Sequence, residues 1–292
     1  MKAAIVEGPN RLVVREIPDP EIGDYDLLCE LLYGATCTAT DRHIIEDNFP
    51  FPVTYPLILG HESIGRVIRI GAKVQNFAPG DLVTRVGAPA TEGLSVAWGG
   101  FAELGVARDH EAMQADDLLP SDWKPHRVNQ RLPSDCDPRA ATMMITWRET
   151  YSYVKRMGIG AGVRVLVIGT GGNGLAFCVH ACNREAAHVA VVGSAARLET
   201  ARQAGAQTTL DYRSPDLEQE LTADGGRYDF IIDAVGTRES LSPAFPALAP
   251  GGTLGVYGIE ERGALRIDPT QVSGSFTVYQ GHYDEAEVHQ EV

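Results

Sequence analysis

The chain has 292 residues, of which 44% are hydrophobic and 22% charged, and 25 basic against 39 acidic residues give a net charge of -14. This composition is typical of a globular protein with room for two domains. An acidic surface repels phosphate backbones, so we expect no nucleic-acid partner. No apolar run reaches the length of a membrane span, and the N-terminal stretch lacks the apolar core of a signal peptide. Five cysteines without a Cys-x-x-Cys pair favour a reducing, cytoplasmic location and no disulfide framework.

The first half of the chain has the pattern of short β-strands separated by turns. Apolar and β-branched residues form short runs, and Gly-Pro, Asp-Pro, Pro-Gly and Gly-Asp pairs lie between them. We therefore expect a compact, barrel-like all-β unit. Its predicted strands cover residues 2–7, 12–17, 26–36, 63–71, 81–87 and 101–107.

The next segment connects this unit to the second half. Residues 111–137 are polar, proline-dotted and weakly periodic, which predicts a long loop. Loops of this length are often functional or mobile, but a surface excursion without a role is an equal alternative. Pro138 and Gly158 then mark the start and end of a predicted helix.

The second half alternates strands with helices. Residues 163–169 form a continuous apolar run, typical of a strand buried on both faces. The alternation predicts βαβ units and a doubly wound parallel sheet, so the fold class is α/β. We place one domain at 1–153 and the other at 154–292. The further strands are predicted at 188–193, 208–212, 228–236, 253–258 and 275–281, and the helices at 172–186, 196–205 and 216–222.

A glycine motif follows the first strand of that sheet. Gly169, Gly171 and Gly174 form Gly-x-Gly-x-x-Gly between a predicted strand and a predicted helix. The glycines permit a tight turn, and the helix N-terminus can bind a pyrophosphate. We therefore assign Gly169, Gly171, Gly172, Asn173 and Gly174 to dinucleotide binding. A tight turn without a ligand is the alternative.

The end of the second strand indicates which dinucleotide is bound. An NAD site usually has an acidic residue there, but Gly193 and Ser194 take its place in this chain. Ser194 can donate a hydrogen bond to a 2′-phosphate, and Arg197 can pair with it. The residues favour NADP over NAD, unless Arg197 only covers a solvated helix face.

The order of the motifs resembles one known family. "TDRH", "GHESIG", "PGDLV", "GGFAE" and "GTGGNG" run along nearly the whole chain as in the medium-chain dehydrogenases, in their zinc-type alcohol and polyol dehydrogenase branch. This resemblance implies a GroES-like β-barrel domain, a Rossmann domain and an active site in the cleft between them. It also implies a small alcohol, polyol, sugar or its carbonyl as substrate. A homodimer or homotetramer that pairs its sheets through residues 275–281 is implied as well.

The resemblance assigns roles to the first motif residue by residue. Thr40 matches the hydroxyl that passes on the alcohol proton, and His43 matches the imidazole that relays it to solvent. Asp41 matches the carboxylate that orients a metal-bound histidine. The expected cysteine ligand falls on Thr38, and Cys37 lies one place early.

The zinc site implied by the resemblance is incomplete. His61 matches the histidine ligand and Glu62 the neighbouring glutamate, and Cys37 would join them only if its loop bulges. The third ligand should lie near Met144 or Ile145, neither of which binds zinc. Cys136, Asp137 and Glu149 are out of register, and the cysteine loop of a structural zinc is absent from the sequence. At most one catalytic zinc is therefore expected.

Three functions remain open from the sequence. With zinc, the ion would polarise the substrate oxygen while Thr40 and His43 carry the proton. Without it, Thr38, Thr40 and His43 would supply hydrogen bonds and a proton, which favours reduction of carbonyls or enones. Because the chain stops in what should be the last Rossmann helix, before the family's return segment, a nucleotide-binding protein without turnover is the third.

Overall fold

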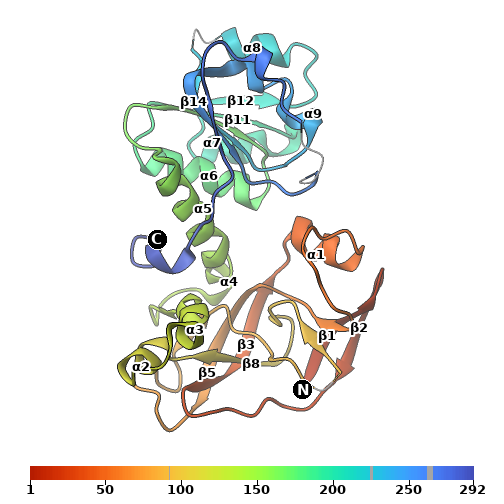
Figure 1. Ribbon diagram of the computed structural model, residues 1–292, viewed down its shortest axis with the longest axis vertical. Coiled ribbons are helices and arrows are strands. Elements are labelled where there is room, and N and C mark those ends of the chain that lie inside the picture. Colours follow the sequence, from red (N-terminus) through yellow and green to blue (C-terminus); the bar gives the residue numbers. More distant parts are fainter. Residues whose placement is uncertain (92, 224–225, 262–265) are drawn as a thin grey trace. The chain divides into compact units, whose positions relative to one another are not determined.

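The computed structural model describes residues 1–91, 93–223, 226–261 and 266–292. The chain forms two compact units, Met1–Ile145 and Thr146–Val292 (Figure 1). The boundary lies within helix α5 (Met144–Met157).

Unit 1 is built on two β-sheets. One has the strand order β8-β3-β5-β6-β9 and the other β2-β1-β4-β7. Their apolar faces bury separate clusters that include Ile5 and Ile58 in one, and Leu27 and Val67 in the other. This agrees with the expected all-β unit. The strands are β1 (Lys2–Gly8), β2 (Arg11–Glu16), β3 (Asp26–Ala35), β4 (Leu57–Ile58), β5 (Glu62–Ile70), β6 (Leu82–Thr84), β7 (Ser95–Val96), β8 (Leu104–Arg108) and β9 (Arg131–Leu132).

The pairing of β3 with β5 brings together the segments that carry the "TDRH" and "GHESIG" motifs. The strands are antiparallel, and Ala35 at the end of β3 lies opposite Glu62 at the start of β5. Residues just after β3 therefore lie beside those just before β5. Cys37 and His61 occupy these two positions.

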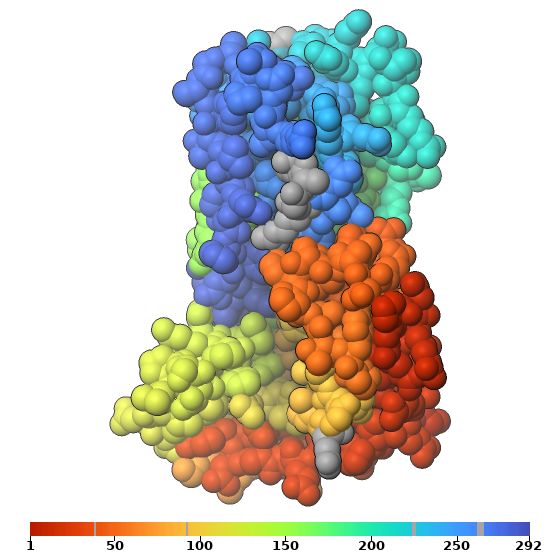
Figure 2. All heavy atoms as spheres, turned by 45° about the vertical axis from the view of Figure 1, so that its right-hand side comes forward, coloured from red at the N-terminus to blue at the C-terminus, as the bar shows by residue number. Residues whose placement is uncertain are grey.

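Helix α1 (Thr38–Ile45) follows β3 directly and was not predicted from the sequence. Its C-terminal end lies against the β1–β2 turn, where Asn10 N donates a hydrogen bond to Ile45 O (2.6 Å). Figure 2 shows this segment, in orange, at the surface next to the red N-terminal strands. The helix gives the motif residues a fixed spacing that an irregular loop would not.

The expected loop at 111–137 is largely structured, so that prediction was wrong. It contains α2 (His110–Ala115), α3 (Pro120–Trp123) and the 3-10 helix η1 (Lys124–Val128). The buried Asp109 carboxylate caps α2 by accepting from Ala112 N (3.0 Å) and also holds Asn76. The helix expected from Pro138 to Gly158 is interrupted, because α4 ends at Ala141 and α5 begins at Met144.

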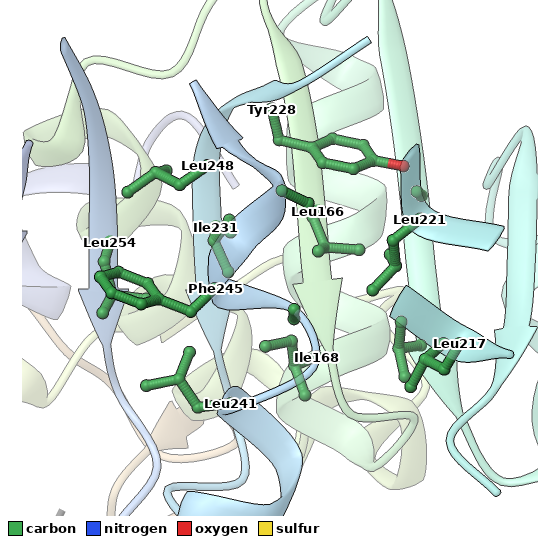
Figure 3. Close-up of a cluster of buried hydrophobic side chains, with 14 of the residues drawn as sticks. Leu166, Ile168, Leu217, Leu221, Tyr228, Ile231, Leu241, Phe245, Leu248 and Leu254 are labelled. Atoms are coloured by element: carbon green, nitrogen blue, oxygen red, sulfur yellow. The ribbon is translucent and has the colours of Figure 1, made fainter. Parts of the chain in front are cut away.

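Unit 2 contains a parallel sheet with the strand order β12-β11-β10-β13-β14-β15. Helices cover both faces: α5, α6 and α7 pack on one, and α8 and α9 on the other. Figure 3 shows the buried cluster on the α8 and α9 side. This confirms the predicted doubly wound α/β fold. The strands are β10 (Arg164–Ile168), β11 (His188–Gly193), β12 (Thr208–Asp211), β13 (Tyr228–Asp233), β14 (Leu248–Val256) and β15 (Thr277–Tyr279), and the helices are α6 (Gly172–Asn183), α7 (Leu198–Gln203), α8 (Leu217–Ala223) and α9 (Arg238–Leu241).

The C-terminal segment is held on α5 by charged groups. It forms the 3-10 helix η5 (Glu285–Val288) where a full helix was expected. The buried Arg148 pairs with Glu285 (2.9 Å), and Arg156 makes two hydrogen bonds to Glu287 (2.8 and 2.9 Å). Within the described ranges, no helix is long and apolar enough to cross a membrane.

Candidate cofactor and catalytic sites

The glycine motif forms a tight turn between β10 and α6. Gly169 has a φ of +116°, a conformation that favours glycine. A Cβ atom on Gly174 would lie 2.1 Å from Gly169 O, so only glycine lets α6 approach the strand this closely. Gly171 is the N-cap of α6, and Gly172 and Asn173 form its first turn, whose N–H groups lack intrahelical acceptors. The loop therefore has the shape of a phosphate-binding turn.

Gly193 at the end of β11 is required by its contact with Thr170. A Cβ atom there would lie 2.1 Å from Thr170 Cγ2 and 2.5 Å from its hydroxyl. That hydroxyl accepts a hydrogen bond from Ser194 N (3.2 Å), and Arg197 Nη1 donates to Thr170 O (3.2 Å). An acidic residue in place of Gly193 is thus sterically excluded. Ser194 and the exposed Arg197 flank the position where the acid of an NAD site would stand.

Tyr212 and Arg213, which follow β12, lie at the same edge of the sheet and were not predicted from the sequence as site residues. Tyr212 N donates to Gly193 O (3.0 Å), which brings the end of β12 beside Ser194. The Arg213 guanidinium lies 5.1 Å from the centre of the Tyr212 ring, which is 49% exposed. The sequence signal that could have found them is an aromatic residue followed by a basic one directly after β12, the third strand of unit 2 along the chain. The pair adds a flat surface and a second positive charge to the edge that carries Arg197.

The cluster in unit 1 joins Cys37, Asp41 and His61. Cys37 is the N-cap of α1, and its N–H donates to Asp41 Oδ2 (2.9 Å). Asp41 Oδ1 and His61 Nδ1 lie 3.4 Å apart, close enough for an ion pair but too poorly aligned for a hydrogen bond. His61 is only 7% exposed. One carboxylate therefore organises both the start of the helix and the imidazole.

The titration behaviour of this cluster follows from its contacts. Burial opposes charge on His61, but Asp41, Cys37 and the negative charge of Glu62 outweigh it and raise the His61 pKa to about 10. Burial also raises the pKa of the Cys37 thiol, but His61 and the Thr40 amide and hydroxyl lower it below its usual value. The two pKa values move in opposite directions, up for His61 and down for Cys37, and both changes favour a thiolate beside an imidazolium.

The other motif residues of unit 1 lie on α1 and β5, the elements next to this cluster. Thr40 and His43 lie three residues apart on α1 and so share one face. His43 is 3% exposed, and its Nδ1 lies 3.4 Å from Asn48 O, so its ring is turned into the fold and away from solvent. Glu62 is buried at the start of β5. The side chain of Thr38, the fourth catalytic candidate, lies outside the described residues.

Gly60 and Trp98 complete the surroundings of His61. Gly60 has a φ of +108°, and a Cβ atom there would lie 2.6 Å from Phe101. The Trp98 ring lies 5.1 Å from the His61 ring, centre to centre, and is 44% exposed. The tryptophan gives the imidazole a partly exposed aromatic neighbour.

The donor atoms do not form a three-ligand zinc site. Cys37 and His61 are adjacent, and Glu62 follows His61 in sequence, but no group of three His, Cys, Asp or Glu side chains in the described ranges is arranged to hold a metal ion. A catalytic zinc needs three protein ligands. The expected set of Cys37, His61 and Glu62 is therefore incomplete as a metal site here.

The alternative third ligands have other roles. Ile145 is fully buried in the apolar core. Asp137 caps α4 by accepting from Arg139 N (2.9 Å), and Glu149 accepts from the Tyr257 hydroxyl (3.3 Å) in unit 2. Cys136 packs against an apolar cluster of unit 1. None of these contacts is that of a metal ligand.

Both halves of the chain match known dehydrogenases. Residues 23–121 match the family model of the alcohol dehydrogenase GroES-like domain, and residues 150–286 match that of zinc-binding dehydrogenases. The chain is 30% identical over 281 residues to a protein of Mycobacterium tuberculosis named probable zinc-binding alcohol dehydrogenase, covering 89% of this chain and 69% of the relative. It is 28% identical over 265 residues to sorbitol dehydrogenase of Ovis aries, covering 87% and 74%.

Solved structures share the fold. The NADP-bound structure of a Sinorhizobium meliloti 1021 protein superposes with a TM-score of 0.80 at 24% identity, covering 99% of this chain and 86% of that one. The 2R,3R-butanediol dehydrogenase of Bacillus subtilis superposes with a TM-score of 0.78 at 21% identity, covering 99% and 87%. The chain thus belongs to the medium-chain dehydrogenase/reductase superfamily and is an oxidoreductase of the zinc-binding alcohol and polyol dehydrogenase type.

Proposed function

We propose that the protein transfers a hydride between NADP(H) and a small alcohol, polyol or sugar, or the corresponding carbonyl. In the reducing direction, the hydride of NADPH goes to the carbonyl carbon and a proton goes to its oxygen, giving the alcohol and NADP⁺. The relatives named for alcohols and sorbitol support the substrate class.

The arrangement of Gly193, Thr170 and Arg197 carries the choice of NADP. An aspartate or glutamate that would bind the ribose hydroxyls and repel a 2′-phosphate has no room beside Thr170. Arg197 is fixed at the carbonyl of Thr170 and keeps further N–H groups for a phosphate. The NADP in the Sinorhizobium meliloti structure is in line with this assignment.

Unit 1 supplies the proton chemistry in this proposal. The Thr40 hydroxyl hydrogen-bonds the substrate oxygen and exchanges its proton, and His43 on the same helix face passes the proton on. The Nδ1 atom of the buried His43 lies 3.4 Å from Asn48 O, a carbonyl oxygen that can orient the ring but cannot carry the proton further. These steps use the chain's own residues, because no third ligand joins Cys37 and His61 among the described residues. A bound zinc would add polarisation of the substrate oxygen to the same proton path.

Kinetics with a matched pair of variants test this function. NADPH should be oxidised with small aldehydes and ketones, and NADPH should have a higher kcat/KM than NADH. Thr40→Val should lower kcat by about a hundredfold or more, while Thr40→Ser, which keeps the hydroxyl, should retain most activity. Tight NADPH binding with no turnover on any carbonyl would instead support a nucleotide-binding protein.

The incomplete metal site favours a second candidate, a zinc-independent NADPH reductase of carbonyls or enones. Two donors without a third bind zinc weakly. Elemental analysis of the purified protein, with activity measured before and after chelation, separates the two. Activity without metal supports the reductase, whereas one zinc per chain with activity lost on chelation supports the alcohol dehydrogenase.

We also infer a homodimer or homotetramer. Strand β15 is at one end of the strand order of the parallel sheet, and its Val278 is 46% exposed. An exposed strand edge is a natural pairing surface. Sedimentation of the wild type and of Val278→Lys would test this, because a charge on that strand should shift the equilibrium to monomers.

A further inference from the structure

Asp233 is a fully buried carboxylate at the end of the central strand β13. It lies opposite Ile168 of β10 in the sheet register, directly beside the start of the glycine loop. Its Oδ1 accepts hydrogen bonds from Val235 N and Gly236 N, both 3.0 Å. The side chain therefore fixes the turn that follows its own strand.

The backbone of the same residue fixes a second turn. Asp233 O accepts from Tyr257 N (3.0 Å) and Gly258 N (2.9 Å), the residues that follow β14. The two turns are in close contact, because a Cβ atom on Gly258 would lie 2.1 Å from Val235 C. One on Gly236, whose φ is +86°, would lie 2.4 Å from Gly258 C. One residue thus joins both turns.

The first of these turns also borders the glycine loop. A Cβ atom on Gly169 would lie 3.2 Å from Val235 Cγ2, and Ala234 N donates to Ile168 O (3.0 Å). The strand order changes direction between β10 and β13, and dinucleotides bind outside the strand ends at such a point. With the adenosine ribose assigned to the end of β11, the nicotinamide half extends over the turn that Asp233 holds.

We propose that Asp233 is a positioning residue for the nicotinamide half of the dinucleotide. It acts through the turns at Ala234–Gly236 and 257–258 and, being buried, does not touch the cofactor. Its Oδ2 makes no hydrogen bond of normal geometry in the described part of the chain, although the Ser240 side chain is close enough to act on the carboxylate. The two backbone bonds of Oδ1 are therefore the contacts that do the positioning. The inference rests on the proposed NADP(H)-dependent function.

Three variants of the full chain test the proposal by NADPH titration, with fluorescence as the readout. Asp233→Ala should weaken NADPH binding about tenfold or more, since two buried N–H groups lose their acceptor. Asp233→Asn keeps an acceptor oxygen and should stay within about twofold of the wild type. Gly258→Ala forces the turns apart while the carboxylate remains, so it should weaken NADPH binding as Asp233→Ala does. It tests the same turns if Asp233→Ala does not fold.

A matched control separates positioning from general loss of stability. Leu221→Ala removes a buried side chain of α8 (Figure 3), so it should lower the melting temperature without changing the NADPH dissociation constant of the folded protein. Equal NADPH affinity in the wild type, Asp233→Ala and Gly258→Ala would overturn the positioning role. A wild type that binds neither NADPH nor NADH would overturn the proposed function itself.

Discussion

Replacing Gly193 by aspartate tests the cofactor assignment most directly. The new Cβ would meet Thr170 Cγ2 at 2.1 Å and Oγ1 at 2.5 Å, so the single variant should be overpacked by about 1–3 kcal/mol. We expect it to lose affinity for NADPH and NADH alike. Adding Thr170→Ala removes the two nearest atoms and leaves the Thr170 Cβ at 2.8 Å, a contact that a small shift can relieve.

The double variant Thr170→Ala/Gly193→Asp should therefore bind NADH. Its carboxylate can accept from the ribose hydroxyls and repels a 2′-phosphate, which also weakens the phosphate contact with Arg197. A charge-assisted hydrogen bond contributes about 1.5–3 kcal/mol, so NADPH affinity should fall about tenfold to a hundredfold. Thr170→Ala alone is the control. An unchanged preference in the double variant, measured by titration with both cofactors, would refute the assignment.

Three further predictions concern stability. Glu285→Gln should destabilise unit 2 by about 3 kcal/mol in urea denaturation, because the buried Arg148 loses a carboxylate at 2.9 Å. Arg156 lowers the Glu287 pKa to about 2. The stabilisation by Glu287 is therefore complete above its unfolded pKa of about 4.3 and is lost as the pH falls towards 2. Hydrogen exchange of the C-terminal segment, measured against pH, should show this loss. Gly60→Ala should lower the melting temperature, because it adds an atom 2.6 Å from an aromatic ring at a φ of +108°.

Each of the three stability predictions has a control variant whose result can contradict it. The double variant Arg148→Met/Glu285→Leu should recover most of the loss, and a Glu285→Gln variant as stable as the wild type would deny the pair its role. Glu287→Gln should remove the part of this pH dependence that Glu287 supplies and leave the part from Glu291, whose pKa Lys155 lowers, so equal curves for both proteins would contradict the linkage. For Gly60, the control is Gly80→Ala, which also has a positive φ but an empty space around its Cβ position. Equal losses in both would show that backbone strain, and not the contact, is the cause.

The sequence predicted unit 2 well because its signals are local. Apolar runs, alternating helices and a glycine turn each follow from neighbouring residues, and Gly169 and Gly174 have the close approach expected of them. From the sequence, Gly193 was noted only because it stands where an NAD site has an acidic residue. Its contact with Thr170 joins residues far apart in the chain and could not be read from spacing.

Unit 1 was harder to predict for physical reasons. Helix α1 has a cysteine at its N-cap and little apolar periodicity, so no start signal marked it. The segment 111–137 has short polar helices, and Asp109, the cap of the first of them, also binds the backbone of the distant residues Gln75 and Asn76. That Cys37 reaches His61 depends on the register of β3 against β5, which only the fold reveals.

This register has a consequence for insertions and deletions. The antiparallel ladder of β3 and β5, and not the count of residues in the motif, sets which residues lie beside His61. Cys37 precedes the expected position in sequence and still contacts His61. A pattern search with fixed spacing would discard this chain, whereas one that measures each residue from the end of β3 would retain it.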